Sequence, residues 1–343
     1  MSSIYYNKNG ELCIQGIKGA RCEVRGLSLV FEDLSKTTNH EPRTPNQKYR
    51  SVITLNTQTG RAAAKINLAI DVLRKRPDGY HDVSMIMQSV ALYDTITVRA
   101  LKGEIKVTAN TDKIPTDKSN IVYKAAEYLK MKYNVKEGVL INIDKAIPVA
   151  AGLAGGSTDA ALTLKLLNKG WDLRLSKNEI LEAGKKLGSD VSFCIQGGTA
   201  LAEGLGEKLT PLPGIPDCLV LLAKPAVSIS TKEVYEGLRL ENIKEKPDIK
   251  DMIRCIDESD LEGIAANMCN VLETVTIKKC PQIEELKERL VEYGALGSMM
   301  SGSGPTVFGI FKDKATAYNA YDHIKDMVNE VFVVKTINQT WDS

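Results

Sequence analysis

Histidine is scarce in this chain, and its cysteines form no recognisable pairs. The three histidines (His40, His81 and His323) lie far apart, which argues against a histidine-based metal centre. The seven cysteines are odd in number and include no Cys-x-x-Cys pair, so we expect neither a disulfide framework nor a zinc site. Reduced thiols of this kind are typical of the cytosol, and the cytoplasm is the expected compartment.

The chain also lacks long apolar runs and a strong charge imbalance. No stretch approaches the roughly 18 apolar residues that span a bilayer, and patches such as Cys218–Ala223 suit buried strands. The formal net charge of +2 gives no bulk electrostatic reason to bind nucleic acid or a membrane surface. The N-terminus lacks the basic start and apolar stretch of a secretory signal. We therefore expect an ordinary soluble globular protein with no nucleic-acid or membrane partner.

The sequence pattern divides the chain into three parts. Residues 1–52 are polar and turn-rich, and we expect an accessory or largely disordered extension. Two short apolar patches within it, Leu12–Ile14 and Leu27–Phe31, could form a weak hairpin with each other. From Ile53 the pattern becomes dense, and the proline-containing stretch Leu212–Pro216 predicts a boundary between domains 53–214 and 215–338.

Strands and helices mix irregularly in these two domains. Strands are predicted at 61–72, 83–98 (one or two strands), 105–109, 139–144, 197–203, 219–223, 298–301, 306–311 and 331–335. Helices are predicted from a Ser119 cap to about 132, from a start within 150–160, from a Ser176 capping box to 187, and at 231–238, 281–292 and 315–328. Because several strands follow one another directly, an α+β fold with a mixed or antiparallel sheet is favoured over a doubly wound parallel one.

The segment Ala150–Ala160 is the most informative of the chain. It places three glycines and two hydroxyls between the predicted strand 139–144 and the start of a predicted helix. This layout presents free backbone N–H groups and the positive end of a helix dipole to a phosphate. No lysine follows Gly155 or Gly156, so it is not a P-loop, and the spacing does not fit a dinucleotide fingerprint. A tight helix entry with no ligand remains an alternative for this motif taken alone.

Two charged residues lie where they could serve phosphoryl transfer. Lys65 interrupts an apolar strand, where a lysine usually faces solvent but could instead direct its charge at a phosphate or carboxylate. Asp190 follows a predicted helix, where spacing alone favours an N-cap role. The functional alternative for Asp190 is a general base that accepts a hydroxyl proton, and one residue can fill both roles.

Two turns carry further candidate groups. In Arg74–His81 a Pro-Asp-Gly turn precedes Tyr80 and His81, which either belong to a simple β-turn or stack on and hydrogen-bond a base. Tyr235 offers a second aromatic wall, although a core tyrosine is the default. The glycine-rich turn Ser301–Thr306 reads as a hairpin loop that could also direct N–H groups towards a ligand.

Taken together, these motifs resemble those of the GHMP small-molecule kinase superfamily. The resemblance runs from about Ile53 to Val334 and rests on Ala64–Leu68 with Arg76–His81, on Ile147–Ala160, and on Gly302–Phe308. The Pro-Asp-Gly-Tyr-His block, at its distance from Lys65, is similar to that of the superfamily members that act on 4-diphosphocytidyl-2-C-methyl-D-erythritol in the non-mevalonate isoprenoid pathway. The fold implied is a ribosomal S5 domain 2-like N-terminal domain followed by a ferredoxin-like C-terminal domain.

The resemblance also implies a role for each matching residue. Asp190 matches the catalytic aspartate and Lys65 the catalytic lysine. The substrate-binding positions are Asn67, Tyr80, His81 and Tyr235, with Tyr235 stacking on the cytosine from the other side. The loop that wraps the ATP phosphates would comprise Pro148, Val149, Ala150, Ala151, Gly152, Leu153, Ala154, Gly155, Gly156, Ser157, Thr158 and Asp159. Thr158 stands where serine is common, and its hydroxyl preserves the chemistry.

The implied reaction is ATP-dependent, Mg²⁺-assisted phosphorylation of the 2-hydroxyl of the cytidine diphosphate substrate. One alternative is a related kinase for homoserine, mevalonate or a sugar, against which the Tyr80-His81 pair argues because a small polyol needs no stacking platform. Another is a non-catalytic nucleotide-binding protein, against which the presence of Lys65 and Asp190 argues. The sequence leaves a monomer or a homodimer open, and it leaves the Mg²⁺ ligands open, with Ser157 a candidate on its hydroxyl alone.

Overall fold

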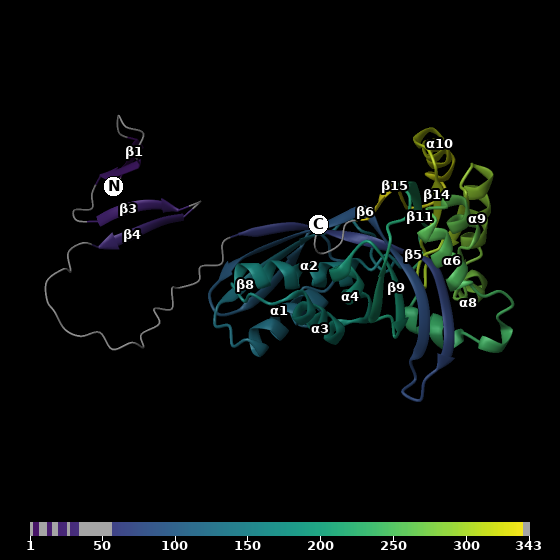
Figure 1. Cartoon of the computed structure of the whole chain (residues 1–343), viewed down its shortest axis with the longest axis horizontal. Coiled ribbons are helices and arrows are strands. Elements are labelled where there is room, and N and C mark those ends of the chain that lie inside the picture. The colour runs from purple at the N-terminus through teal and green to yellow at the C-terminus, as the bar shows by residue number, and fades with distance from the viewer. Residues whose placement is uncertain (1–2, 7–11, 16–19, 26–27, 34–56, 339–343) are drawn as a thin grey trace. The chain divides into compact units, whose positions relative to one another are not determined.

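The computed structural model describes the backbone of residues 3–6, 12–15, 20–25, 28–33 and 57–338, and side chains within 57–338. The chain forms two compact units, residues 1–52 and 53–343 (Figure 1). In the first unit two antiparallel pairs form, β1 (Ser3–Tyr6) with β2 (Leu12–Gln15) and β3 (Ala20–Arg25) with β4 (Ser28–Asp33). The prediction that the patches at 12–14 and 27–31 pair with each other is therefore wrong, because each pairs with its nearer neighbour.

Two long antiparallel strands organise the second unit. They are β5 (Gln58–Lys75) and β6 (His81–Leu101), which pair over nearly their whole length with three register shifts. The segment predicted as one or two strands over 83–98 is thus a single strand. From Ala64 to Val72 every residue of β5 is buried, since packed elements cover both faces there. The strand can therefore hold a polar side chain such as Lys65 inside the protein.

β6 pairs with several other strands along its length. It contacts β9 (Thr199–Gly204) near its start, β15 (Glu330–Ile337) in the middle and β8 (Gly138–Asp144) near its end. β7 (Ile105–Ala109) runs parallel to β8, and β10 (Lys208–Leu212) runs antiparallel to β9. Four helices pack together against this half of the sheet (Figure 1): α1 (Ile121–Lys132), α2 (Gly155–Gly170), α3 (Lys177–Leu187) and α4 (Ser189–Gln196).

The second half of the unit has a ferredoxin-like arrangement. Its strands β11 (Leu219–Lys224), β13 (Gly297–Met300), β14 (Val307–Phe311) and β15 lie in the order β15-β11-β14-β13, all antiparallel. α9 (Gln282–Glu292) and α10 (Lys314–Ile324) pack on this sheet. The connection from β11 also contains α5 (Thr231–Gly237), a 3₁₀ turn (Leu240–Asn242), α6 (Ile249–Asp257), α7 (Leu261–Ala266), β12 (Cys269–Asn270) and α8 (Glu273–Lys279).

The fold is α+β with a mixed sheet, as predicted. Among the described strands only β7–β8 and β12–β5 pair in parallel. The boundary proposed at 214/215 falls in residues 213–218, which contain no helix or strand. The Ser176 capping box is confirmed, but α1 is capped by Asn120 rather than Ser119, because the Asn120 side chain accepts from the Val122 N–H. The short helix α4 was not expected.

Candidate functional site

Most of the predicted site residues line one cleft of about 1160 Å³. Lys65 and Asn67 come from β5, His81 from β6, Asp190 from α4 and Tyr235 from α5. The rest of the predicted set on the cleft wall are Tyr80, Pro148, Val149, Ala150, Ala151, Gly152, Ala154, Gly155, Gly156, Ser157 and Asp159. Leu153 and Thr158 are buried and do not line the cleft, so their side chains support the loop from beneath.

The Lys65 ammonium connects three elements of the cleft. It donates to Asn67 Oδ1 (2.7 Å) and to the Gly152 carbonyl oxygen (3.1 Å), and its Nζ lies 3.7 Å from Asp190 Oδ2. Only 4% of Lys65 is exposed, so the solvent-facing alternative is wrong. The charge is instead held on a rigid strand between the glycine loop and the carboxylate of α4. Asn67 is itself fully buried, and its oxygen orients Lys65.

The glycine loop is held against the second glycine-rich turn. Ser301 Oγ donates to the Gly152 carbonyl oxygen (3.0 Å), and a Cβ on Gly152 would meet the Ser301 carbonyl oxygen at 2.1 Å. Gly152 has φ +76°, and Ala150 and Ala154 also have positive φ values. Non-glycine residues in this region cost about 1–2 kcal/mol each, which is typical of a loop shaped for a ligand.

The loop leads directly into the first turn of α2. Ala154 precedes the helix in the left-handed conformation, and no side chain caps the helix start. The backbone N–H groups of Gly155, Gly156 and Ser157 in this first turn therefore have no capping partner, and all three residues line the cleft. This geometry suits an anion such as a phosphate.

Asp190 lies in the first turn of α4, with its side chain 29% exposed to the cleft. The N-cap prediction is wrong, because Gly188 occupies that position and no side chain caps α4. Two neighbours respond to the carboxylate charge. Burial, followed by the Asp190 charge, raises the pKa of the Cys194 thiol to about 12. Burial followed by the Asp190 charge likewise raises the pKa of the Tyr235 hydroxyl. Both groups therefore stay protonated at neutral pH.

Two aromatic rings meet in the same cleft. The His81 and Tyr235 rings lie 5.3 Å apart between centroids, tilted by 36°. Burial, with a smaller contribution from the Lys75 charge, lowers the pKa of His81, so its imidazole is neutral at pH 7. Tyr80 is 65% exposed at the cleft mouth. The structure thus brings His81 and Tyr235 together, and both are suited to contact a planar base.

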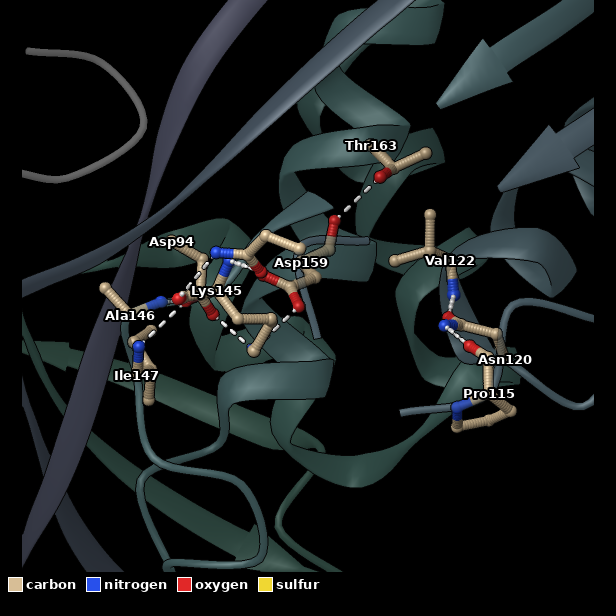
Figure 2. Close-up of polar contacts among 10 residues, drawn as sticks. Asp94, Pro115, Asn120, Val122, Lys145, Ala146, Ile147, Asp159 and Thr163 are labelled. Carbon is tan, nitrogen blue, oxygen red and sulfur yellow. Dashed lines mark hydrogen bonds and ion pairs between the residues drawn. The ribbon is translucent and has the colours of Figure 1, made fainter. Parts of the chain in front are cut away.

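A buried charge cluster, which no motif of the sequence predicts, lies beneath the loop. Lys145 forms ion pairs with Asp94 of β6 and, at 2.9 Å, with Asp159 of α2 (Figure 2). Asp94 and Lys145 are 51 residues apart, so no local pattern could join them. Burial raises the pKa of Asp159 to about 8 despite the nearby ammonium. The cluster links the central strand, the loop after β8 and the start of α2.

Other cleft residues were also missed. The segment Ile114–Ile121 contributes Ile114, Pro115, Ser119, Asn120 and Ile121, and α3 contributes Lys185, Lys186 and Leu187. Asn120 fixes the first segment by donating to the Pro115 carbonyl oxygen (Figure 2). The turn after β13 is fixed in a similar way, since Asn270 Nδ2 donates to the carbonyl oxygens of Met300 and Gly302, each at 2.8 Å.

Neither a preformed metal cage nor a membrane span is found in the described residues. No group of three or more His, Cys, Asp or Glu side chains gathers there as a metal site. No helix in the same part of the chain has both the length and the apolar character to cross a membrane. Mg²⁺ often binds through one or two carboxylates together with substrate phosphates, and Asp159 Oδ1, buried without a hydrogen-bond partner, fits such a requirement.

Comparison with known proteins gives family matches on either side of residue 214. The description "GHMP kinases N terminal domain" matches residues 120–198, and "GHMP kinases C terminal" matches residues 247–330. Two curated relatives are both named 4-diphosphocytidyl-2-C-methyl-D-erythritol kinase. One, from Alkaliphilus oremlandii (strain OhILAs), is 50% identical over 81% of this chain and 96% of its own length. The other, from Clostridioides difficile (strain 630), is 51% identical over 80% and 94%.

Solved structures agree with these matches. A crystal structure of 4-(cytidine 5'-diphospho)-2C-methyl-D-erythritol kinase is 26% identical, covers 81% of this chain and 99% of its own, and superposes with a TM-score of 0.71. A homoserine kinase from Cytophaga hutchinsonii shares the fold at 19% identity, with a TM-score of 0.68 over 86% of this chain and 99% of its own. This chain therefore belongs to the GHMP kinases, in the family of the 4-diphosphocytidyl-2-C-methyl-D-erythritol kinases.

Proposed function

We propose that the chain transfers the γ-phosphoryl group of ATP to the 2-hydroxyl of 4-diphosphocytidyl-2-C-methyl-D-erythritol. The observation that carries this proposal is the Lys65–Asp190 pair, which lines the same cleft as the glycine loop and the His81–Tyr235 rings. A phosphate-binding loop, a carboxylate base and an aromatic wall are what phosphoryl transfer to a nucleotide-linked alcohol requires. The relatives' names supply the identity of that alcohol.

In this reaction the substrate hydroxyl oxygen forms a bond to the γ-phosphorus, and the bond from that phosphorus to the β–γ bridging oxygen breaks. ADP leaves with the bridging oxygen. Asp190 accepts the proton of the hydroxyl, a role for which its position in the cleft and its ion pair with Lys65 are suitable.

Lys65 supports the transfer in two ways. Its ammonium forms an ion pair with the Asp190 carboxylate, and it also stabilises negative charge that develops on the transferring group. Because Asn67 and the Gly152 carbonyl also hold the ammonium, it needs little reorganisation during the reaction. This preorganisation is the main source of catalysis where little covalent chemistry falls to the protein.

The loop 148–159 and the first turn of α2 would bind the ATP phosphates through backbone N–H groups. Bound with ATP, Mg²⁺ would neutralise charge on the phosphates. The cleft offers it oxygen donors, among them the Ser157 hydroxyl and buried carboxylate oxygens.

The aromatic wall would recognise the cytidine diphosphate part of the acceptor. A neutral imidazole at His81 can exchange hydrogen bonds with a base edge, and the Tyr235 ring gives a face for stacking. Tyr80, exposed at the mouth, is positioned to close over the same base. An acceptor without a base, such as homoserine, mevalonate or galactose, would use none of these contacts.

A coupled ADP-release assay tests this proposal. Purified protein with ATP and Mg²⁺ is supplied in turn with 4-diphosphocytidyl-2-C-methyl-D-erythritol, homoserine, mevalonate and galactose. We expect turnover with the cytidine diphosphate compound alone. Turnover with another acceptor would refute the substrate assignment, and ATP binding without turnover on any acceptor would favour a non-catalytic role.

A further inference from the structure

The cluster beneath the glycine loop contains one carboxylate that has partners at both of its oxygens. Asp94 Oδ1 accepts from the backbone N–H groups of Ala146 (2.6 Å) and Ile147 (2.8 Å), and Asp94 Oδ2 pairs with Lys145 (Figure 2). Asp94 is fully buried. Asp94 and Lys145 therefore form a closed and electrically neutral pair that joins β6 to the loop before the glycine motif.

The second carboxylate, that of Asp159, is not compensated in this way. Its Oδ2 shares Lys145, at 2.9 Å, whereas its Oδ1 is buried without a hydrogen-bond partner among the described residues. Asp159 is only 2% exposed. Two carboxylates share one ammonium, so Asp159 has no charge partner of its own, and ionising it in this buried place costs free energy unless a partner arrives.

The position of Asp159 indicates what kind of partner that is. Asp159 is the fifth residue of α2 and lines the cleft together with Gly155, Gly156 and Ser157. Lys145 Nζ packs closely under the same turn, 3.0 Å from where a Cβ on Gly155 would be. ATP phosphates bound at this turn would face the Asp159 carboxylate with charge of the same sign. A cation between the two would remove that repulsion and supply the missing partner.

We propose that Asp159 is the carboxylate that binds the Mg²⁺ of the Mg·nucleotide complex, through Oδ1. This inference rests on the proposed function, because it presumes that the nucleotide occupies the glycine loop. Mg²⁺ prefers oxygen ligands and is commonly held by one or two carboxylates plus phosphate oxygens. The lack of a three-residue acidic cage among the described residues agrees with a metal that binds together with the nucleotide rather than alone.

A purely structural role for Asp159 makes a different prediction. If its contact with Lys145 mainly held α2 in place, removing the carboxylate would lower the melting temperature. If Asp159 is instead a carboxyl group kept for a ligand, Asp159→Asn leaves the neutral Asp94–Lys145 pair intact. The variant should then be as stable as the wild type or more stable, as is common when a functional charge is removed.

The test measures Mn²⁺ binding by electron paramagnetic resonance, with ADP as the nucleotide. Asp159→Asn is compared with wild type and with Asp172→Asn, which removes a carboxylate from the exposed Asp172–Arg174 ion pair just beyond the far end of α2. Asp159→Ser serves as a second variant without the carboxylate, should the amide perturb Lys145. Binding of ADP in excess EDTA and the melting temperature are measured on the same proteins.

We expect both Asp159 variants to bind Mn²⁺ in the ADP complex about 10-fold or more weakly. Their affinity for metal-free ADP and their melting temperature should not fall, and Asp172→Asn should match wild type. Unchanged Mn²⁺ affinity would overturn the proposal, as would a parallel loss of metal-free ADP binding and stability. If the wild type did not bind ADP at all, the proposed nucleotide site itself would be refuted. That result differs from normal ADP binding with unchanged Mn²⁺ affinity, which refutes only the role of Asp159.

Discussion

Replacing Gly152 by alanine should lower both the stability of the protein and its turnover, and the structure indicates by how much. Gly152 has φ +76°, and a Cβ there would lie 2.1 Å from the Ser301 carbonyl oxygen. The turn that carries Ser301 cannot easily retreat, because Asn270 holds the carbonyl oxygens of Met300 and Gly302 on either side. The loop must therefore move away from Lys65, which donates to the Gly152 carbonyl oxygen.

The size of the effect follows from two terms. A non-glycine residue in the left-handed region costs about 1–2 kcal/mol, and overpacking of a tight contact costs about 1–3 kcal/mol. Gly152→Ala should therefore lower the free energy of unfolding by about 2–5 kcal/mol. A displacement of about 1 Å at a catalytic constellation can cost about 100-fold in rate, so kcat should fall by a similar factor.

Urea unfolding followed by circular dichroism measures the first effect, and the coupled ADP-release assay measures the second. Gly156→Ala is the matched control, because a Cβ there would meet only Ile121 Cγ2 at 3.6 Å, an ordinary contact. In the first turn of a helix that change should leave stability unchanged or raise it by up to about 1 kcal/mol. A Gly152→Ala variant as stable as wild type would refute the close packing of Gly152 against the Ser301 carbonyl oxygen.

Two further substitutions test the surroundings of Asp190. Burial lowers the pKa of Lys165 to about 8, and its Nζ donates to the Ile195 carbonyl oxygen (2.9 Å) of α4, which carries Asp190. Between pH 8 and an unfolded-state pKa of about 10.4 the unfolded chain binds more protons at this site. We therefore expect the difference in unfolding free energy, wild type minus Lys165→Met, to rise by about 1–3 kcal/mol over that window. Denaturant titrations measure this difference, and a difference that does not change with pH would refute the lowered pKa of Lys165. Tyr235→Leu should raise KM for the cytidine diphosphate acceptor about 5- to 150-fold, as expected for a lost stacking contact. Steady-state kinetics should show KM for ATP unchanged, and an equal rise in both constants would place Tyr235 outside the acceptor site.

Much of this site could be predicted because its signals are local in sequence. The glycine spacing of residues 150–160, with a strand before and a helix after, predicts a phosphate loop, although a tight helix entry stays an alternative for this motif alone. The turn at Arg76–His81 likewise predicts where His81 lies, because this short connection from β5 fixes the start of β6. The Ser176 capping box is local in the same sense, and it is confirmed.

The errors arose where neighbours or distant residues decide the structure. Ser119 and Asn120 are both good capping residues, and only the Asn120 contacts with Pro115 and Val122 select the second. Asp190 lies within the first turn of α4 and not at its cap, because the helix already begins at Ser189, and its eight residues are too few to show a helical period in the sequence. The Asp94–Lys145–Asp159 cluster depends on the packing of β6 against α2 and has no signal in any single segment.

The central claim is that Asp190 takes the proton of the acceptor hydroxyl, and Asp190→Asn tests it most directly. The amide keeps the shape of the carboxylate but cannot accept that proton. Turnover with 4-diphosphocytidyl-2-C-methyl-D-erythritol should fall by about 100- to 10,000-fold, while the affinity for Mg·ATP, measured by calorimetry, stays at the wild-type value. Turnover near that of the wild type would contradict the account.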